Sequence, residues 1–194
     1  MKTDSIREYI EKNYSEKRKV HTEGVRKTAI ALARKYGADE KKAEIAALFH
    51  DMYRGVSEEV LNYYVKHLNL PQKYKNNCNL AHGKIAAIVM ENEYHIEDED
   101  ILNAVKFHTT GRAGMSLLEK IIYIADAIEP NRNYPGVEQL RKVAETDLDE
   151  ACLLSLTNTI HFVNSEKKYL DEDTVLAQKD LERLIKNKKE RLDD

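Results

Sequence analysis

The chain has 194 residues, of which 34% are charged and 42% are hydrophobic, and its formal net charge is -3. This length allows one domain with a full hydrophobic core, and the mild negative charge argues against a general nucleic-acid binder, which carries a basic patch. Seven glycines and three prolines leave few interruptions between helices, so the composition favours an all-α fold. Since we find no leading apolar segment or membrane-spanning run, we expect no membrane partner and a cytoplasmic location.

Helix caps divide the chain into ten predicted helices. Ser15 precedes the second helix, which ends where Gly37 can adopt a left-handed conformation. Asp39 begins the next helix, and Thr146 with Asp149 forms a capping-box pattern. No stretch alternates as a strand would. The predicted ranges are 3–13, 16–36, 40–52, 58–68, 80–93, 99–108, 116–128, 137–145, 147–166 and 174–191.

We expect these helices to form a single domain over residues 1–194, with its core at about 15–165. The last helix, 174–191, reads as a charged amphipathic end piece. The two cysteines, Cys78 and Cys152, match no zinc spacing and cannot make a disulfide framework.

Several ionisable residues interrupt the apolar faces of these helices. Side chains three or four residues apart share a helix face, so a residue in line with apolar neighbours is expected to point inward. The residues concerned are His21, His50 with the adjacent Asp51, His82, His108 and Asp126. Burying a lone carboxylate costs several kcal/mol, so Asp126 requires a cation or a proton.

A shared metal ion would supply that cation. Imidazole and carboxylate ligands suit zinc, iron and manganese better than calcium, which takes all-oxygen shells. No cysteine joins the group, which argues against a closed structural zinc site. Each histidine alone is consistent with an ordinary core residue, and an HD dipeptide is only two residues long. The metal hypothesis therefore depends on the joint pattern.

The same residues carry a resemblance to a known family. His21, His50 with Asp51, and Asp126 match the H…HD…D motif of the HD-domain phosphohydrolases, and His82 and His108 match the extended pattern of dinuclear members. Four segments resemble those of the bacterial YqeK-type symmetrical diadenosine tetraphosphatases. They are "RKVHTEGV", "AEIAALFHD", "FHTTGRAGMSLLEKIIYIADAIEPNR" and "YPGVEQLRKVAETDLDEA". This resemblance covers roughly residues 15–165.

The resemblance implies an HD-domain helical bundle with a buried metal site. It implies symmetrical hydrolysis of diadenosine tetraphosphate to two ADP through a metal-activated water, with iron as the metal, bound as one or two ions, and zinc or manganese as alternatives. The implied metal ligands are His21, His50, Asp51, His82, His108 and Asp126. If two ions bind, we expect Asp51 to bridge them, and we expect Asp51 and His82 to be the catalytic residues.

Cations and hydroxyls close to these ligands are candidates for phosphate binding. Arg18 lies about one helical turn before His21 on the same face, and the run "HTTGRAG" after a ligand predicts a phosphate clamp. The expected substrate-binding residues are Arg18, Asp51, Arg54, His82, Thr109, Thr110, Arg112 and Arg132.

Two alternatives stay open from the sequence. The first is another HD-type nucleotide phosphohydrolase or phosphodiesterase, because ligand spacing does not separate these substrates. The second is a non-catalytic nucleotide- or metal-binding regulatory module, whose sign would be a missing ligand; none is missing. We expect a dinucleoside polyphosphate as the partner and no nucleic acid, and the sequence leaves a homodimer open.

Overall fold

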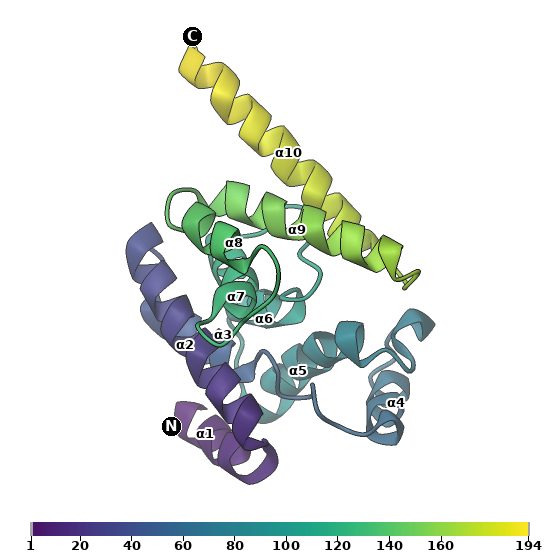
Figure 1. The fold of residues 1–194 in the computed structure, drawn as a ribbon. Helices are drawn as coiled ribbons and strands as arrows, with labels where there is room; N and C mark the ends of the chain where they lie inside the picture. The colour runs from purple at the N-terminus through teal and green to yellow at the C-terminus, as the bar shows by residue number, and fades with distance from the viewer. Residues whose placement is uncertain (1, 194) are drawn as a thin grey trace.

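The computed structural model describes residues 2–193, with the side chains of residues 4–191. All regular structure in that range is helical, which confirms the predicted all-α class (Figure 1). The α-helices are α1 (Lys2–Asn13), α2 (Glu16–Tyr36), α3 (Glu40–Phe49), α4 (Glu58–His67), α5 (Cys78–Tyr94), α6 (Glu99–Lys106), α7 (Leu117–Ile128), α8 (Val137–Ala144), α9 (Leu148–Ser165) and α10 (Glu172–Asp193). A short 3-10 helix, η1 (Gln72–Tyr74), lies between α4 and α5.

The predicted helix boundaries agree with the observed ones to within two residues, except at the end of the third helix. The helix predicted over 40–52 ends at Phe49, and residues 50–55 form turns, so the histidine–aspartate pair follows α3. The predicted capping box at Thr146 is wrong, because Asp147 caps α9 instead. Its carboxylate accepts hydrogen bonds from the backbone N–H groups of Asp149 and Glu150, at 2.9 and 3.1 Å. The short helix η1 was not predicted.

Helix α7 occupies the centre of the bundle. It packs against α2, α3, α6, α8 and α9, while α2 also lies along α3. Ile121, Ile122 and Ile124 are all fully buried although they point to different sides of the helix. A helix that is apolar on all sides belongs in the interior. The same helix therefore carries Asp126, near its C-terminal end, into the middle of the molecule.

Two glycines allow close approach at the positions where ionisable side chains gather. A Cβ at Gly83 on α5 would lie 2.7 Å from the carbonyl oxygen of Val105 and 3.0 Å from Nδ1 of His108. A Cβ at Gly24 on α2 would collide with the carboxylate of Glu129. Because these distances are below van der Waals contact, only glycine permits this packing without a shift.

Helix α10 leaves the body of the molecule, as the yellow end of the ribbon shows (Figure 1). Ala177, Leu181 and Ile185, each four residues from the next, are buried, whereas most other side chains of the helix are exposed. This confirms that the segment is amphipathic. Its beginning is held by Lys84 of α5, whose Nζ lies 3.2 Å from the carboxylate of Asp173. Among the described helices, none combines the length and the apolar character needed to cross a membrane.

Candidate metal centre

The structure brings all six predicted ligands together from five parts of the chain. They are His21 on α2, His50 and Asp51 in the turn after α3, His82 on α5, His108 just beyond α6, and Asp126 on α7. Their side chains form two overlapping groups, His21 with His50 and Asp126, and His50 with Asp51 and His108. Within each group the ligand atoms lie within 4.8 Å of one another.

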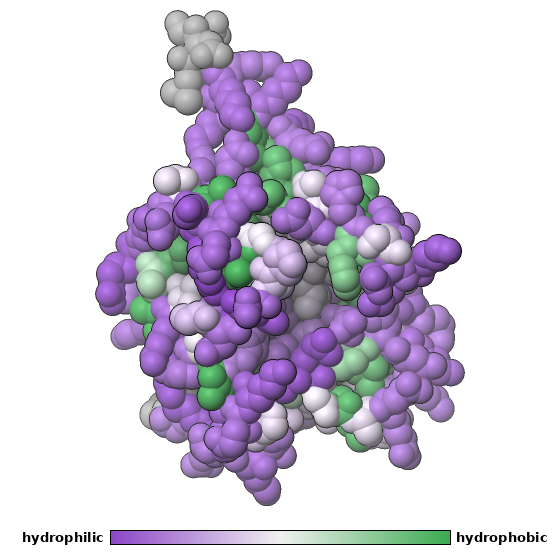
Figure 2. Space-filling model, viewed as in Figure 1, coloured by the Kyte–Doolittle hydropathy of each residue, from purple (hydrophilic) through white to green (hydrophobic). Residues whose placement is uncertain are grey.

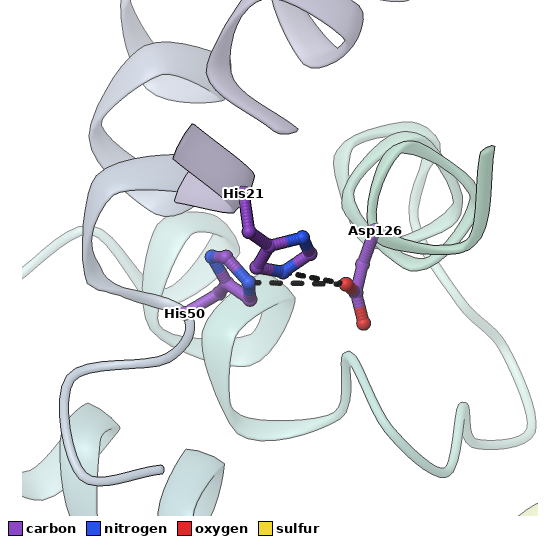
Figure 3. A group of neighbouring side chains, drawn as sticks. All are labelled: His21, His50 and Asp126. Carbon is purple, nitrogen blue, oxygen red and sulfur yellow. Dashed lines mark ion pairs between the residues drawn. The ribbon is translucent and has the colours of Figure 1, made fainter. Parts of the chain in front are cut away.

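The first group centres on Asp126. Its Oδ1 lies 3.1 Å from Nε2 of His21 and 4.0 Å from Nε2 of His50. Figure 3 shows both imidazole rings directing this nitrogen toward the same carboxylate oxygen, although they come from separate helical segments. Two nitrogens and one oxygen thus converge on a shared space.

Asp51 connects this group to the other two histidines. Its Oδ2 lies 3.8 Å from Nε2 of His21 and 3.9 Å from Nε2 of His50. Its Oδ1 lies 3.2 Å from Nε2 of His82, and that nitrogen lies 3.0 Å from Nε2 of His108. One carboxylate oxygen therefore faces each pair of histidines, the position that a bridging ligand requires.

Local hydrogen bonds fix the orientation of three of the imidazole rings. Nδ1 of His50 contacts the carbonyl oxygen of Ala47 at 2.7 Å, Nδ1 of His82 that of Cys78 at 2.6 Å, and Nδ1 of His108 that of Val105 at 2.7 Å. A carbonyl oxygen only accepts, so each Nδ1 must carry the proton. In a neutral ring the lone pair is then on Nε2, the atom that faces the cluster.

His21 is oriented in a different way, by the carboxylate of Glu129. Oε1 of Glu129 lies 3.1 Å from Nδ1 of His21, and Oε2 accepts hydrogen bonds from the backbone and side-chain nitrogens of Asn131 at 2.8 and 2.9 Å. Glu129 is 1% exposed. A carboxylate behind a histidine ligand sets its tautomer and increases its basicity. We did not predict Glu129 from the sequence, although it lies three residues after Asp126.

The cluster has the features that a bound cation would satisfy. Nε2 of His50 is buried and has no hydrogen-bond partner among the described residues, which is costly for a polar atom. Nε2 of His82 and Nε2 of His108 face each other at 3.0 Å while both Nδ1 atoms donate elsewhere. The two nitrogen lone pairs repel each other at that distance unless a proton or a metal ion binds to one or both of them. The donor set therefore fits a divalent metal.

Burial and mutual charges set the protonation states that metal binding needs. Burial lowers the pKa of His50 below its ordinary value and lowers the pKa of His108 to about 3, so both rings are neutral at pH 7. Burial raises the pKa of Asp51 and Asp126, but the histidines around both and Arg132 beside Asp126 outweigh it and hold each pKa well below the usual range. Neutral imidazoles and ionised carboxylates are the forms that coordinate metals.

Three of the predicted phosphate-binding arginines line the cavity beside the cluster. The cavity has a volume of about 1000 Å³, and Arg18, Arg54, Arg132 and Thr109 lie in its wall. Nη1 of Arg18 lies 2.8 Å from Oδ2 of Asp51. Arg132 forms an ion pair with Asp126 and donates from Nε to that residue's carbonyl oxygen at 2.8 Å. Figure 2 shows the hollow in the middle of the face viewed.

Thr110 and Arg112 lie apart from the other predicted phosphate contacts. Neither lies in the wall of the cavity. Thr110 is fully buried, and its hydroxyl donates to the carbonyl oxygen of Gly111 at 2.9 Å. Arg112 donates to both carboxylate oxygens of the buried Glu119, at 2.7 and 2.6 Å. A bidentate ion pair of this kind has a structural role, so we leave both residues out of the substrate site.

Comparisons with known proteins agree with this geometry. Residues 18–131 match the HD domain family model, and this range includes all six clustered residues. The chain is 44% identical over 169 residues to the Bacillus subtilis protein named "Bis(5'-nucleosyl)-tetraphosphatase, symmetrical", covering 87% of this chain and 91% of that one. It is 43% identical to the Halalkalibacterium halodurans protein of the same name, covering 89% of this chain and 92% of that one.

A solved structure is also similar over most of the chain. It is the crystal structure of a predicted HD superfamily hydrolase involved in NAD metabolism from Clostridium acetobutylicum. The TM-score is 0.87 at 44% identity, and the match covers 92% of this chain and 96% of that one. The chain is thus an HD domain protein that belongs to the family of the symmetrical bis(5'-nucleosyl)-tetraphosphatases.

Proposed function

We propose that this protein hydrolyses diadenosine tetraphosphate at the central oxygen of the tetraphosphate chain, giving two ADP. One observation carries the proposal: a buried cluster of histidines and aspartates with an unpartnered imidazole nitrogen opens into a polar cavity lined by arginines. Relatives that share 44% and 43% identity over nearly their whole length are named for this activity.

The six clustered residues are the ones that would hold the metal. When bound, a divalent ion supplies positive charge to phosphate oxygens and lowers the pKa of water toward neutrality. The mixture of imidazole and carboxylate without thiolate supports iron, zinc or manganese, and we propose iron, bound as one or two ions. Asp51 is the proposed bridge, since its two oxygens face different histidines.

The cations of the cavity wall would bind the phosphates of the substrate. A tetraphosphate carries several negative charges, and a planar guanidinium can donate two parallel hydrogen bonds to a phosphate group. Arg18 and Arg132 contact Asp51 and Asp126 respectively, which supports our proposal that they bind phosphates on opposite sides of the bond that breaks. Arg54 and the hydroxyl of Thr109 are further proposed contacts.

Asp51 and His82 are the residues that we propose for proton transfer. Oδ1 of Asp51 and Nε2 of His82 are 3.2 Å apart, and both residues line the cavity. When one ion is held by His21, His50, Asp51 and Asp126, Nε2 of His82 keeps its lone pair beside Asp51. It can then accept a proton as water attacks phosphorus and return it to a product phosphate.

Product analysis tests the proposal. Protein purified without oxygen, with its metal quantified, is incubated with diadenosine tetraphosphate, and the nucleotides are separated by chromatography. Two ADP per substrate are expected, and formation of ATP with AMP, or no cleavage at all, would refute symmetrical hydrolysis. A panel that includes a deoxynucleotide and a cyclic dinucleotide separates this activity from the other HD-type hydrolases. Tight nucleotide binding without any turnover would indicate the alternative function, a non-catalytic regulatory module.

Three other expectations drawn from the sequence remain predictions. They are the single domain over residues 1–194, the cytoplasmic location and a homodimer. Size-exclusion chromatography with light scattering tests the homodimer directly.

A further inference from the structure

The wall of the cavity has two parts of different chemistry, which we call arms. The first, which we call the cationic arm, is lined by Lys17, Arg18, Arg54, Asn77 and Asn79, from the beginnings of α2 and α5 and the turn after α3. The second, the aromatic arm, is lined by Tyr134, Phe162, Lys168 and Tyr169, with Ser155 and Thr159 of α9.

The metal centre lies between the arms. Asp51 is paired with Arg18 of the cationic arm, at 2.8 Å. Asp126 is paired with Arg132, and the next residue of α7, Ala127, accepts a hydrogen bond from the Tyr134 hydroxyl of the aromatic arm at 2.9 Å. His21 joins the two, because its Nε2 lies 3.8 Å from Asp51 and 3.1 Å from Asp126. A molecule bound across the cluster would therefore extend into both arms.

The aromatic arm offers flat apolar surface to the cavity. Tyr134 is 39% exposed, Phe162 is 56% exposed and Tyr169 is 51% exposed, although aromatic rings are usually covered in folded proteins. Any nucleobase can stack on such rings, because every base has a flat π-face whatever polar groups it carries. Nζ of Lys168 lies over the Phe162 ring, 5.0 Å from its centre, so this cation covers part of one face of the ring.

The cationic arm lacks this surface. None of the five residues that define it is aromatic, and their side chains carry ammonium, guanidinium and amide groups. Ser15 and Leu80, their neighbours in sequence, add a hydroxyl and a leucine side chain to the wall. Such groups donate hydrogen bonds to phosphate oxygens but provide no platform for a base. The two halves of a symmetrical dinucleotide would thus meet unlike surroundings.

We propose that the cavity stacks only one nucleoside of its substrate, in the aromatic arm, and holds the other half through its phosphates in the cationic arm. This inference rests on the proposed function and defines its substrate class. The second nucleoside can be any base or be absent, so adenosine 5'-tetraphosphate is also a substrate. In that reaction the oxygen of one water bonds to one of the two central phosphorus atoms and the bridging oxygen leaves with the other. The products are ADP and pyrophosphate, and the two protons of the water pass to them or to solvent.

A series of three substrates tests the inference with the metal-loaded protein. They are diadenosine tetraphosphate, adenosine 5'-tetraphosphate and linear inorganic tetraphosphate. The step from diadenosine tetraphosphate to adenosine 5'-tetraphosphate removes one nucleoside and should change kcat/KM by less than about threefold. The step from adenosine 5'-tetraphosphate to inorganic tetraphosphate removes the stacked nucleoside and should lower kcat/KM by about 10- to 100-fold, because a stacking contact is lost. Equal losses at both steps, or no cleavage of adenosine 5'-tetraphosphate while diadenosine tetraphosphate still gives ADP, would overturn the inference. Failure to form ADP from diadenosine tetraphosphate would instead refute the proposed function.

A pair of variants locates the stacking surface. Phe162→Ala should raise KM for both adenosine substrates by about tenfold while leaving kinetics on inorganic tetraphosphate unchanged. Tyr63→Ala is the matched control, since Tyr63 on α4 is also 56% exposed but stacks on His67 outside the cavity. Calorimetry gives a second measurement: Phe162→Ala should weaken binding of ADP but not of pyrophosphate. Equal weakening of both ligands, or unchanged ADP binding, would remove Phe162 from the site and overturn the assignment of this arm.

Discussion

Glu129→Gln is expected to weaken metal binding while leaving the fold intact. The substitution conserves shape, but one carboxylate oxygen becomes an NH₂ group, which donates. In the structure Oε2 accepts two hydrogen bonds from Asn131, whereas Oε1 contacts only Nδ1 of His21. The amide oxygen is therefore expected at the Asn131 side, which turns the NH₂ group toward His21.

That orientation changes the tautomer of His21. With an N–H group facing it, Nδ1 must accept, so the proton of the neutral ring moves to Nε2, the atom 3.1 Å from Asp126. A protonated nitrogen cannot bind a metal. Loss of such a supporting residue typically costs about 10- to 100-fold in metal affinity, which corresponds to about 1.4 to 2.7 kcal/mol.

Competition with a chelator of known affinity measures the effect, and circular dichroism checks the fold. Glu119→Gln is the matched control, because Glu119 is 2% exposed and accepts its hydrogen bonds, two from Arg112 and one from the backbone N–H of Ser116, away from the cluster. The control should lower thermal stability but not metal affinity. Equal metal affinity for Glu129→Gln and the native protein would show that this carboxylate does not orient His21.

Three further predictions follow from the same contacts. Asp126→Asn should abolish tight metal binding, because it removes the carboxylate on which two histidines converge; full metal content by elemental analysis would contradict this. Arg112→Ala should leave KM unchanged but destabilise the protein by about 3 kcal/mol, since it leaves Glu119 buried without its ion-pair partner. A raised KM with unchanged urea denaturation would show instead that Arg112 binds the phosphates. Acid should destabilise the metal-free protein. Burial lowers the pKa of His108 to about 3, while in the unfolded chain it is about 6.5. Between these values the unfolded chain binds the extra proton, so the free energy of unfolding falls by up to about 1.4 kcal/mol per pH unit as pH falls. Urea titrations of His108→Leu should show a shallower slope, because His50, whose pKa is also lowered by burial, still contributes; an unchanged slope would contradict the role of His108.

The sequence predicted the helices and the inward direction of the ionisable side chains because both depend on local periodicity. A histidine in line with apolar residues on a helix is expected to point into the core, and His82 and His108 are indeed buried. The end of α3 was missed because His50 and Asp51 continue the apolar pattern although the backbone turns after Phe49.

The sequence could not identify contacts between residues whose proximity depends on loops. Arg112 follows a ligand by four residues and looked like a phosphate contact, yet the turn before α7 brings it to Glu119. Glu129 could have been suggested by its spacing from Asp126, but its contact with His21 spans 108 positions. The exposed rings of the aromatic arm carry no sequence signal, since exposure is a property of the assembled cavity.

The hydrogen bonds of the four imidazole rings imply an order in which the site matures during folding. His50, His82 and His108 each donate to a carbonyl only three or four positions earlier, so these rings acquire their direction as soon as the local turn forms. His21 acquires it only when α2 docks on the end of α7 and meets Glu129. Metal capture would thus report on the docking of these two helices, and an intermediate that lacks it would bind the ion weakly.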